Sequence, residues 1–154
     1  MISISVQQEA FDPGQLTTAA HAGDAAIGAL VCFTGYVRDF SEQQEVGKLF
    51  LEHFAGMTEK SLHDIAAQAC RRWPLYRMQV VHRIGMLHAG EPIVFVAAAS
   101  SHRKDAFAAC EFVMDYLKTR APFWKKEYTK DGSHWVAGRS SDQQAAARWE
   151  AGEK

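Results

Sequence analysis

Residues 116–127, YLKTRAPFWKKE, gather the side chains best suited to chemistry in this chain. Lys118 precedes a break at Pro122, and Lys125 and Lys126 follow it beside two large aromatic residues. Ammonium groups held together against apolar walls repel one another and lose hydration, so such a cluster suits an anionic ligand or a lysine of lowered pKa. On spacing alone, the commoner outcome is a solvated helix end followed by a basic edge strand.

The predicted geometry of this segment favours a shared site. If residues 123–128 form a strand, Lys125 and Glu127 lie on one face and Lys126 on the other. The proline turn can fold Lys125 back toward Lys118. Two ammonium groups about 4 Å apart repel by roughly 4 kcal/mol at an effective dielectric near 20. With desolvation added, one lysine moves toward the neutral form that acts as a general base or nucleophile.

Other cations stand at the ends of predicted elements. His102 and Arg103 open a helix, where free N–H groups and the positive end of the dipole favour an anion. Arg38 follows an apolar strand, and Arg139 follows the last hairpin. Each pattern is weak alone, because a solvated first turn or a surface arginine gives the same sequence.

Composition narrows the class of protein. The 154 residues carry 17 Lys+Arg against 18 Asp+Glu and are 47% hydrophobic, which is typical of one globular domain without general affinity for nucleic acid or anionic membranes. The first residues lack the basic and apolar regions of a signal peptide, and no apolar run approaches the roughly 20 residues of a membrane span. We therefore expect a cytoplasmic protein.

The cysteines and histidines do not indicate a metal or redox site. Cys32, Cys70 and Cys110 form no CxxC pair, and we expect all three in the core. The histidines show no HxH or HExxH spacing, and His53 and His82 read as hydrogen-bonded structural residues. GxSxG, Walker A and GxGxxG are absent as well. We expect no metal and no cofactor, which leaves a cationic pocket.

The elements that position these residues alternate between strands and helices. Hairpin-like connections outnumber βαβ units, which predicts an α+β fold with a mostly antiparallel sheet, about three helices and a hairpin extension. We expect strands at residues 2–6, 26–37, 48–54, 77–84, 92–99, 123–128 and 133–136, helices at about 12–22, 58–73 and 102–118, and a mobile loop at 39–47. Residues 1–139 form the predicted catalytic domain. Residues 140–154 form a polar tail, either a loose helix or partly disordered.

Two details of the helices can be tested directly. We expect Thr58 to cap the second helix and Ser101 to cap the third. Steps of three and four residues place Phe107, Cys110, Met114 and Leu117 on the buried stripe of the third helix.

Five collinear stretches resemble the catalytic (large) subunit family of molybdopterin synthase. They are FTGYVRDF at 33–40, LEHFAGMTEK at 51–60, HRIGMLHAGEPIVFVAAASSHR at 82–103, MDYLKTRAPFWKKE at 114–127 and SDQQAAARW at 141–149. Together they cover most of the chain, and the fourth is highly specific alone. The resemblance implies an α/β hammerhead-like fold and a reaction that installs the two dithiolene sulfurs of molybdopterin on cyclic pyranopterin monophosphate.

The resemblance also implies partners. The sulfur arrives as a thiocarboxylate on the C-terminal Gly-Gly of a small ubiquitin-like subunit, and the assembly is a heterotetramer around a homodimer of large subunits. Because the donor carries its own sulfur, no cysteine of this chain has to attack.

The same resemblance assigns site residues by position. Lys118 and Lys125 match the catalytic lysines. The substrate-contacting stretches match Tyr36, Val37, Arg38, His102, Arg103, Lys126 and Glu127, with Arg139, Phe33 and Met114 as further candidates. Part of each pocket is expected from the neighbouring subunit. Tyr36 departs from the basic residue that would be unsurprising there.

Two other functions remain open at this point. A non-catalytic module that binds a ubiquitin-like tail or a phosphorylated small molecule would need the same cationic pocket. A cysteine-persulfide sulfurtransferase is disfavoured by the predicted core position of Cys110.

Overall fold

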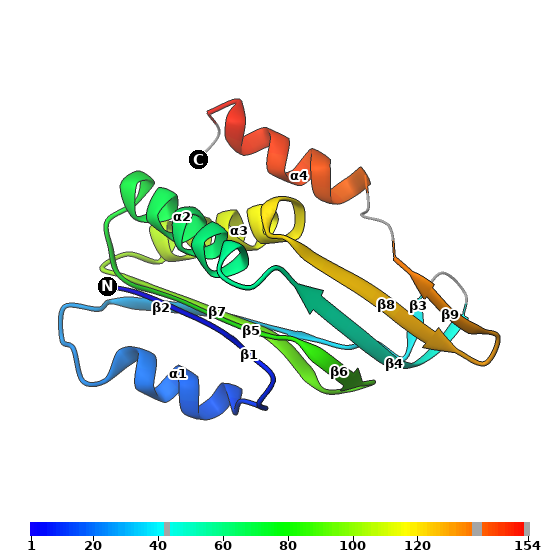
Figure 1. Cartoon of the computed structure of the whole chain (residues 1–154). Helices are drawn as coiled ribbons and strands as arrows, with labels where there is room; N and C mark the ends of the chain where they lie inside the picture. Colours follow the sequence, from blue (N-terminus) through cyan, green and yellow to red (C-terminus); the bar gives the residue numbers. More distant parts are fainter. Residues whose placement is uncertain (42–43, 137–139, 153–154) are drawn as a thin grey trace.

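Two β-sheets and four helices make up the computed structural model, which describes residues 1–41, 44–136 and 140–152 (Figure 1). The strand order of the first sheet is β1 (Ile2–Gln7), β5 (Leu75–Arg83), β7 (Pro92–Ser100) and β2 (Ala29–Tyr36). β1 is parallel to β5, and the other pairings are antiparallel. The predicted α+β class with a mostly antiparallel sheet is confirmed.

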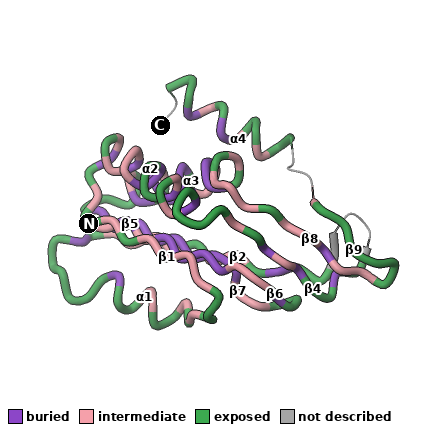
Figure 2. Tube along the Cα trace, in the orientation of Figure 1, coloured by how far each residue is buried: buried purple, intermediate pink, exposed green. Residues whose placement is uncertain are grey.

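Helices cover both faces of the first sheet. α1 (Pro13–His21) lies on one face, and α2 (Met57–Arg72) and α3 (Arg103–Arg120) lie on the other (Figure 1). The central strand β7 is therefore a continuous apolar run, IVFVAAA, buried throughout. Figure 2 shows burial concentrated where this sheet meets α2 and α3.

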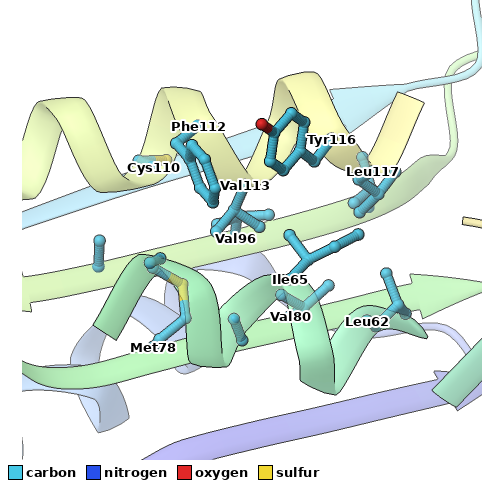
Figure 3. Close-up of a cluster of buried hydrophobic side chains, with 14 of the residues drawn as sticks. Leu62, Ile65, Met78, Val80, Val96, Cys110, Phe112, Val113, Tyr116 and Leu117 are labelled. Carbon is cyan, nitrogen blue, oxygen red and sulfur yellow. The ribbon is translucent and has the colours of Figure 1, made fainter. Parts of the chain in front are cut away.

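The main core lies between α2, α3 and the first sheet. Figure 3 shows Ile65 of α2, Val80 and Val96 of the sheet, and Val113 and Tyr116 of α3 packed together. Cys110 belongs to this core, as predicted, while Cys32 and Cys70 are only half-buried. This packing fixes the direction of α3 and so the place where the helix ends.

The second sheet extends beyond the helices (Figure 1). It comprises β3 (Phe40–Ser41), β4 (Gln44–His53), β8 (Phe123–Thr129) and β9 (Gly132–Trp135), and β6 (Gly85–His88) also pairs with β4. The mobile loop expected at 39–47 was wrong for its described part. Phe40 and Ser41 pair with Glu45 and Gln44, so a polar sequence here continues the ladder as a hairpin.

The C-terminal tail contains a helix, α4 (Ser140–Glu150), so the described residues hold four helices rather than about three. Trp149 is buried against Trp73 and Phe112, and its indole N–H donates to the Asp115 carboxylate at 2.7 Å. Arg148 pairs with the same carboxylate at 3.4 Å. Trp149 and Ala146, both buried, together with these polar contacts dock an otherwise polar helix.

Two helix details differ from expectation. Phe107 is 61% exposed, because small Ala106 and Ala109 share the buried face with Cys110 and bring α3 close to the sheet. The N-cap of α3 is His102, one residue later than Ser101.

Thr58 lies in the first turn of α2, and Gly56, at φ 83°, is the N-cap. The Thr58 hydroxyl instead accepts from the Phe54 N–H at 3.0 Å and donates to the Pro122 carbonyl at 3.2 Å. Thr58 thus ties the start of α2 to the turn after α3.

In the part of the chain that the structure describes, no helix combines the length and apolar character needed to cross a membrane.

Candidate functional site

A cavity of about 400 Å³ opens where the C-terminal end of α3 meets both sheets. Its charged lining residues come from distant parts of the chain: Arg38, Lys118, Lys125, Glu127 and Asp142. The remaining wall is largely apolar and includes Phe33, Val37, Leu49, Ile93, Val94, Met114, Leu117 and Phe123. Cations set against such a wall are poorly screened, so the cavity suits an anionic ligand with an apolar body.

The two lysines reach one cavity because the chain reverses between them. Lys118 is in the last turn of α3, and the helix ends at Ala121, which has an extended backbone with ψ 133°. The Phe123 N–H donates to the Ala121 carbonyl at 2.9 Å, which tightens the turn into β8. Lys125 then sits opposite Leu51 of β4 in the second sheet. The prediction that the proline turn brings Lys125 back toward Lys118 is confirmed to the extent that both lysines line the same cavity.

Side chains of β8 alternate as predicted. Phe123, Lys125 and Glu127 line the cavity, whereas Lys126 does not. The Lys126 ammonium lies 5.7 Å from the centroid of the Tyr128 ring and 5.6 Å from that of Trp135, in cation–π contact on the other side. Within one chain, Lys126 is therefore separated from the two cavity lysines.

Arg38 is placed at the cavity by the end of β2. The Val37 N–H donates to the Glu91 carbonyl at 2.9 Å, and the Gly90 N–H donates to the Val37 carbonyl at 2.7 Å. These two bonds fasten the segment to the β6–β7 turn. Tyr36, Val37 and Arg38 all line the cavity, as do the further candidates Phe33 and Met114.

Acidic groups limit the positive charge of the cavity. Glu127 is buried, and its carboxylate lies 3.3 Å from Nε2 of His134 on β9. Asp142 reaches the cavity from the first turn of α4. Sequence reasoning did not find Asp142, because it lies in the tail whose packing against α3 could not be foreseen.

His82 is likewise a titratable lining residue that sequence reasoning did not assign to the site. Its side chain is 4% exposed, its Nδ1 lies 2.8 Å from the Arg83 carbonyl, and its ring stacks on Phe123 at 4.0 Å between centroids. The prediction of a hydrogen-bonded histidine is thus confirmed for His82, which is also part of the cavity wall, but it is wrong for the buried Nδ1 of His53, which has no hydrogen-bond partner among the described residues. One signal in the sequence could have placed His82 there: side chains alternate along a strand, so His82 lies on the same face of β5 as buried Val80.

His102 and Arg103 lie elsewhere in the single chain. Both are exposed at the N-terminal end of α3. At 1.5 Å per residue, Arg103 is about 22 Å along the helix axis from Lys118. Arg103 instead borders a second depression, together with Lys104, Phe107 and Trp149. The remaining candidate, Arg139, lies outside the described residues.

None of the cysteines lines the cavity. Burial raises the pKa of the Cys110 thiol to about 12, and burial also raises the pKa of Cys32 and of Cys70. Such thiols are poor nucleophiles near neutral pH. Across residues 1–41, 44–136 and 140–152, no three His, Cys, Asp or Glu side chains converge as metal ligands would.

Comparison with known proteins agrees with this architecture. Residues 6–120 match the family model described as MoaE protein. The chain is 64% identical over 149 residues to the molybdopterin synthase catalytic subunit of Pseudomonas aeruginosa, covering 97% of this chain and 99% of the relative. Identity to the subunit of the same name from Vibrio cholerae is 55%, covering 96% and 97%.

Solved structures give the same result. The MoaE protein from Burkholderia ambifaria superposes with a TM-score of 0.83 at 53% identity, covering 97% of this chain and 99% of that one. Molybdopterin synthase from Staphylococcus aureus gives a TM-score of 0.78 at 34% identity, covering 88% and 96%. The family model matches most of the chain, and the sequence relative and the solved structure each match 97% of it, so the chain belongs to the MoaE family.

Proposed function

We propose that this chain is the sulfur-transferring subunit of a cytoplasmic molybdopterin synthase. It moves sulfur from the C-terminal thiocarboxylate of a small ubiquitin-like subunit to cyclic pyranopterin monophosphate, and two such transfers form the molybdopterin dithiolene. The observation that carries the proposal is one cavity that Arg38, Lys118 and Lys125 line together with a largely apolar wall. Relatives at up to 64% identity that are named as the catalytic subunit support it.

The two lysines share the chemical work in this proposal. When the thiocarboxylate sulfur bonds to a pterin carbon, the bond from that carbon to an oxygen substituent breaks, so the leaving oxygen needs a proton and the developing charge needs stabilisation. The water that then attacks the acyl carbon needs a base to accept its proton. Lys118, at the end of α3, is the principal catalytic residue, and Lys125, on β8, is its partner. Hydrolysis of the acyl–sulfur bond then leaves the sulfur on the pterin and a carboxylate on the donor tail.

Arg38 suits the phosphate of the substrate. A guanidinium binds phosphate oxygens through two parallel hydrogen bonds, which fixes orientation as well as charge. Phe33 and Met114 line the same cavity and offer apolar surface to the pterin rings. Tyr36, Val37 and Glu127 complete the substrate contacts that we propose within one chain.

Three cations outside this cavity need a second copy to reach substrate. His102, Arg103 and Lys126 do not line the cavity of their own chain. We propose that two copies form a homodimer, that these residues serve the site of the neighbouring copy, and that two small subunits complete a heterotetramer. The word subunit in the names of the close relatives supports an assembly of more than one kind of chain.

The direct test is incubation of the protein with the pterin precursor and a thiocarboxylated partner, with dithiolene product detected by mass spectrometry. We expect product with the native chain and none with Lys118→Ala at unchanged circular dichroism. If the native chain bound both ligands tightly but formed no product, the protein would be a binding module and not an enzyme.

A further inference from the structure

His82 occupies an unusual place for a buried polar residue. It is on β5, one strand in from the edge of the first sheet, with Val6 and Val94 as its ladder neighbours. Its ring stacks on Phe123, the first residue of β8 in the second sheet, with 19° between the ring planes. The imidazole therefore bridges the two sheets at the wall of the cavity.

The hydrogen bond at Nδ1 fixes the tautomer of this ring. The Arg83 carbonyl, 2.8 Å from Nδ1, can only accept, so Nδ1 carries the proton. In a neutral imidazole the other nitrogen, Nε2, then has a lone pair and acts as an acceptor. The ring is neutral because burial, together with the nearby charges of Lys125 and then Lys118, lowers the pKa of His82 to about 3. The bond to the Arg83 carbonyl opposes this only in part.

Among the charged groups around the cavity, Lys125 is the best-placed donor for Nε2. An acceptor needs a donor, and Lys125 lies two residues beyond Phe123 on the face of β8 that lines the cavity with His82. Among the residues that the structure describes, the charged ones that line the cavity are Arg38, Lys118, Lys125, Glu127 and Asp142. Only the first three donate, and Lys125 is carried by the same strand as Phe123, on which the ring stacks.

We propose that His82 is a positioning residue for sulfur transfer, with its Nε2 accepting a hydrogen bond from the Lys125 amine and so holding that amine at the cavity wall. The inference rests on the proposed function for its consequence in catalysis. Its structural part, the hydrogen bond from the Lys125 amine to His82, does not depend on the proposed function and is tested separately. A neutral acceptor orients the amine without adding another positive charge to a cavity that must bind an anion.

The structural part is tested by 15N NMR of the imidazole nitrogens in the native chain and in Lys125→Met. We expect Nε2 to be unprotonated between pH 5 and 8, with a resonance that moves in Lys125→Met while the Nδ1 resonance stays. A protonated Nε2, or an Nε2 resonance indifferent to Lys125, would overturn the proposal.

The catalytic part is tested by a pair of substitutions that separate the two ring nitrogens. Glutamine places its amide near the position of Nε2, whereas asparagine places its amide near Nδ1 and can keep the bond to the Arg83 carbonyl. We expect His82→Gln to keep kcat within about threefold and His82→Asn to lower it roughly 100-fold with KM unchanged, because a displaced amine costs about that much. Exposed His63 on α2 supplies the control, His63→Gln.

The opposite ranking, with asparagine active and glutamine inactive, would assign His82 a purely structural bond to the Arg83 carbonyl and end the proposal. If neither variant folds, the NMR experiment on the native chain decides. Failure of the proposed function looks different, because the native chain itself would then form no product.

Discussion

The two ends of α3 carry similar cations in different surroundings. At the N-terminal end, His102, Arg103 and Lys104 are exposed, and Arg103 and Lys104 border a depression whose described lining residues all belong to α3 and α4. At the C-terminal end, Lys118 is followed by a reversal into β8, which brings Lys125 to the same cavity. The two ends differ in the elements that meet there, because among the described residues both sheets contribute to the cavity at the C-terminal end and neither contributes to the depression at the N-terminal end.

The largest expected effect is on product formation, which should depend on the lysine at the C-terminal end of α3 and not on the lysine at the N-terminal end. Lys118→Ala should lower product formation by at least about 10³-fold, since it removes a group proposed to act on the reacting atoms. Lys104→Ala, the same change at the exposed end of the same helix, should leave turnover unchanged. Single-turnover assays with thiocarboxylated partner measure both. Equal losses in the two variants would remove the distinction between the ends.

The exposed end can be tested by complementation between chains. If Arg103 serves the neighbouring copy, Arg103→Ala should lower turnover strongly, and an equal mixture of Arg103→Ala and Lys118→Ala chains should recover about a quarter of native activity. Half of the dimers in such a mixture are mixed, and each has one intact site. No recovery after dissociation and reassembly would place Arg103 outside the neighbouring site.

A smaller effect comes from two buried hydroxyls, one at each end of α3. Thr58 bonds the Pro122 carbonyl beside the cavity, and Ser100 donates to the Pro74 carbonyl at 2.8 Å near the other end. Thr58→Val and Ser100→Ala should each lower the free energy of unfolding by about 0.5–1.5 kcal/mol, since each removes a hydrogen bond that a buried hydroxyl donates to a carbonyl. Chemical denaturation gives these values.

Only Thr58→Val should also lower kcat, because only that bond holds the turn between Lys118 and Lys125. A loss of kcat in Ser100→Ala of the same size would show that stability, rather than lysine placement, limits turnover.

The smallest effect is a pH dependence of stability. Burial, followed by the charges of Lys125 and Lys118, lowers the pKa of His82 to about 3, whereas an unfolded histidine titrates near 6.5. Between these values the unfolded state binds more protons, so stability falls as the pH drops below about 6.5, by about 1 kcal/mol per pH unit. Unfolding curves between pH 7 and 5 should show this slope in the native chain and in His102→Gln, but not in His82→Gln. An unchanged slope in His82→Gln would assign it to other groups.

Local patterns predicted the lysine site well. The proline break and strand alternation placed Phe123, Lys125 and Glu127 on one face, and the structure gives that face to the cavity. Such features depend only on neighbours in sequence. The resemblance then indicated Arg38, which comes from a distant strand end and which spacing alone left as a surface residue.

Features set by packing were missed. Phe107 fitted the helical stripe, yet small Ala106 and Ala109 take the buried face and leave it exposed. Asp142 and His82 reach the cavity only because α4 docks through Trp149 and because the two sheets meet at Phe123. The periodic pattern of residues within one segment does not show which other segment packs against it.

The most direct test of the central claim is a crystal structure of the assembled protein with the pterin precursor and the partner's Gly-Gly tail bound. We predict that the phosphate lies at Arg38 and that the end of the tail lies within hydrogen-bond reach, about 3 Å, of the Lys118 amine. A tail and a pterin seated elsewhere, with the Lys118 and Lys125 amines directed into solvent, would contradict the account.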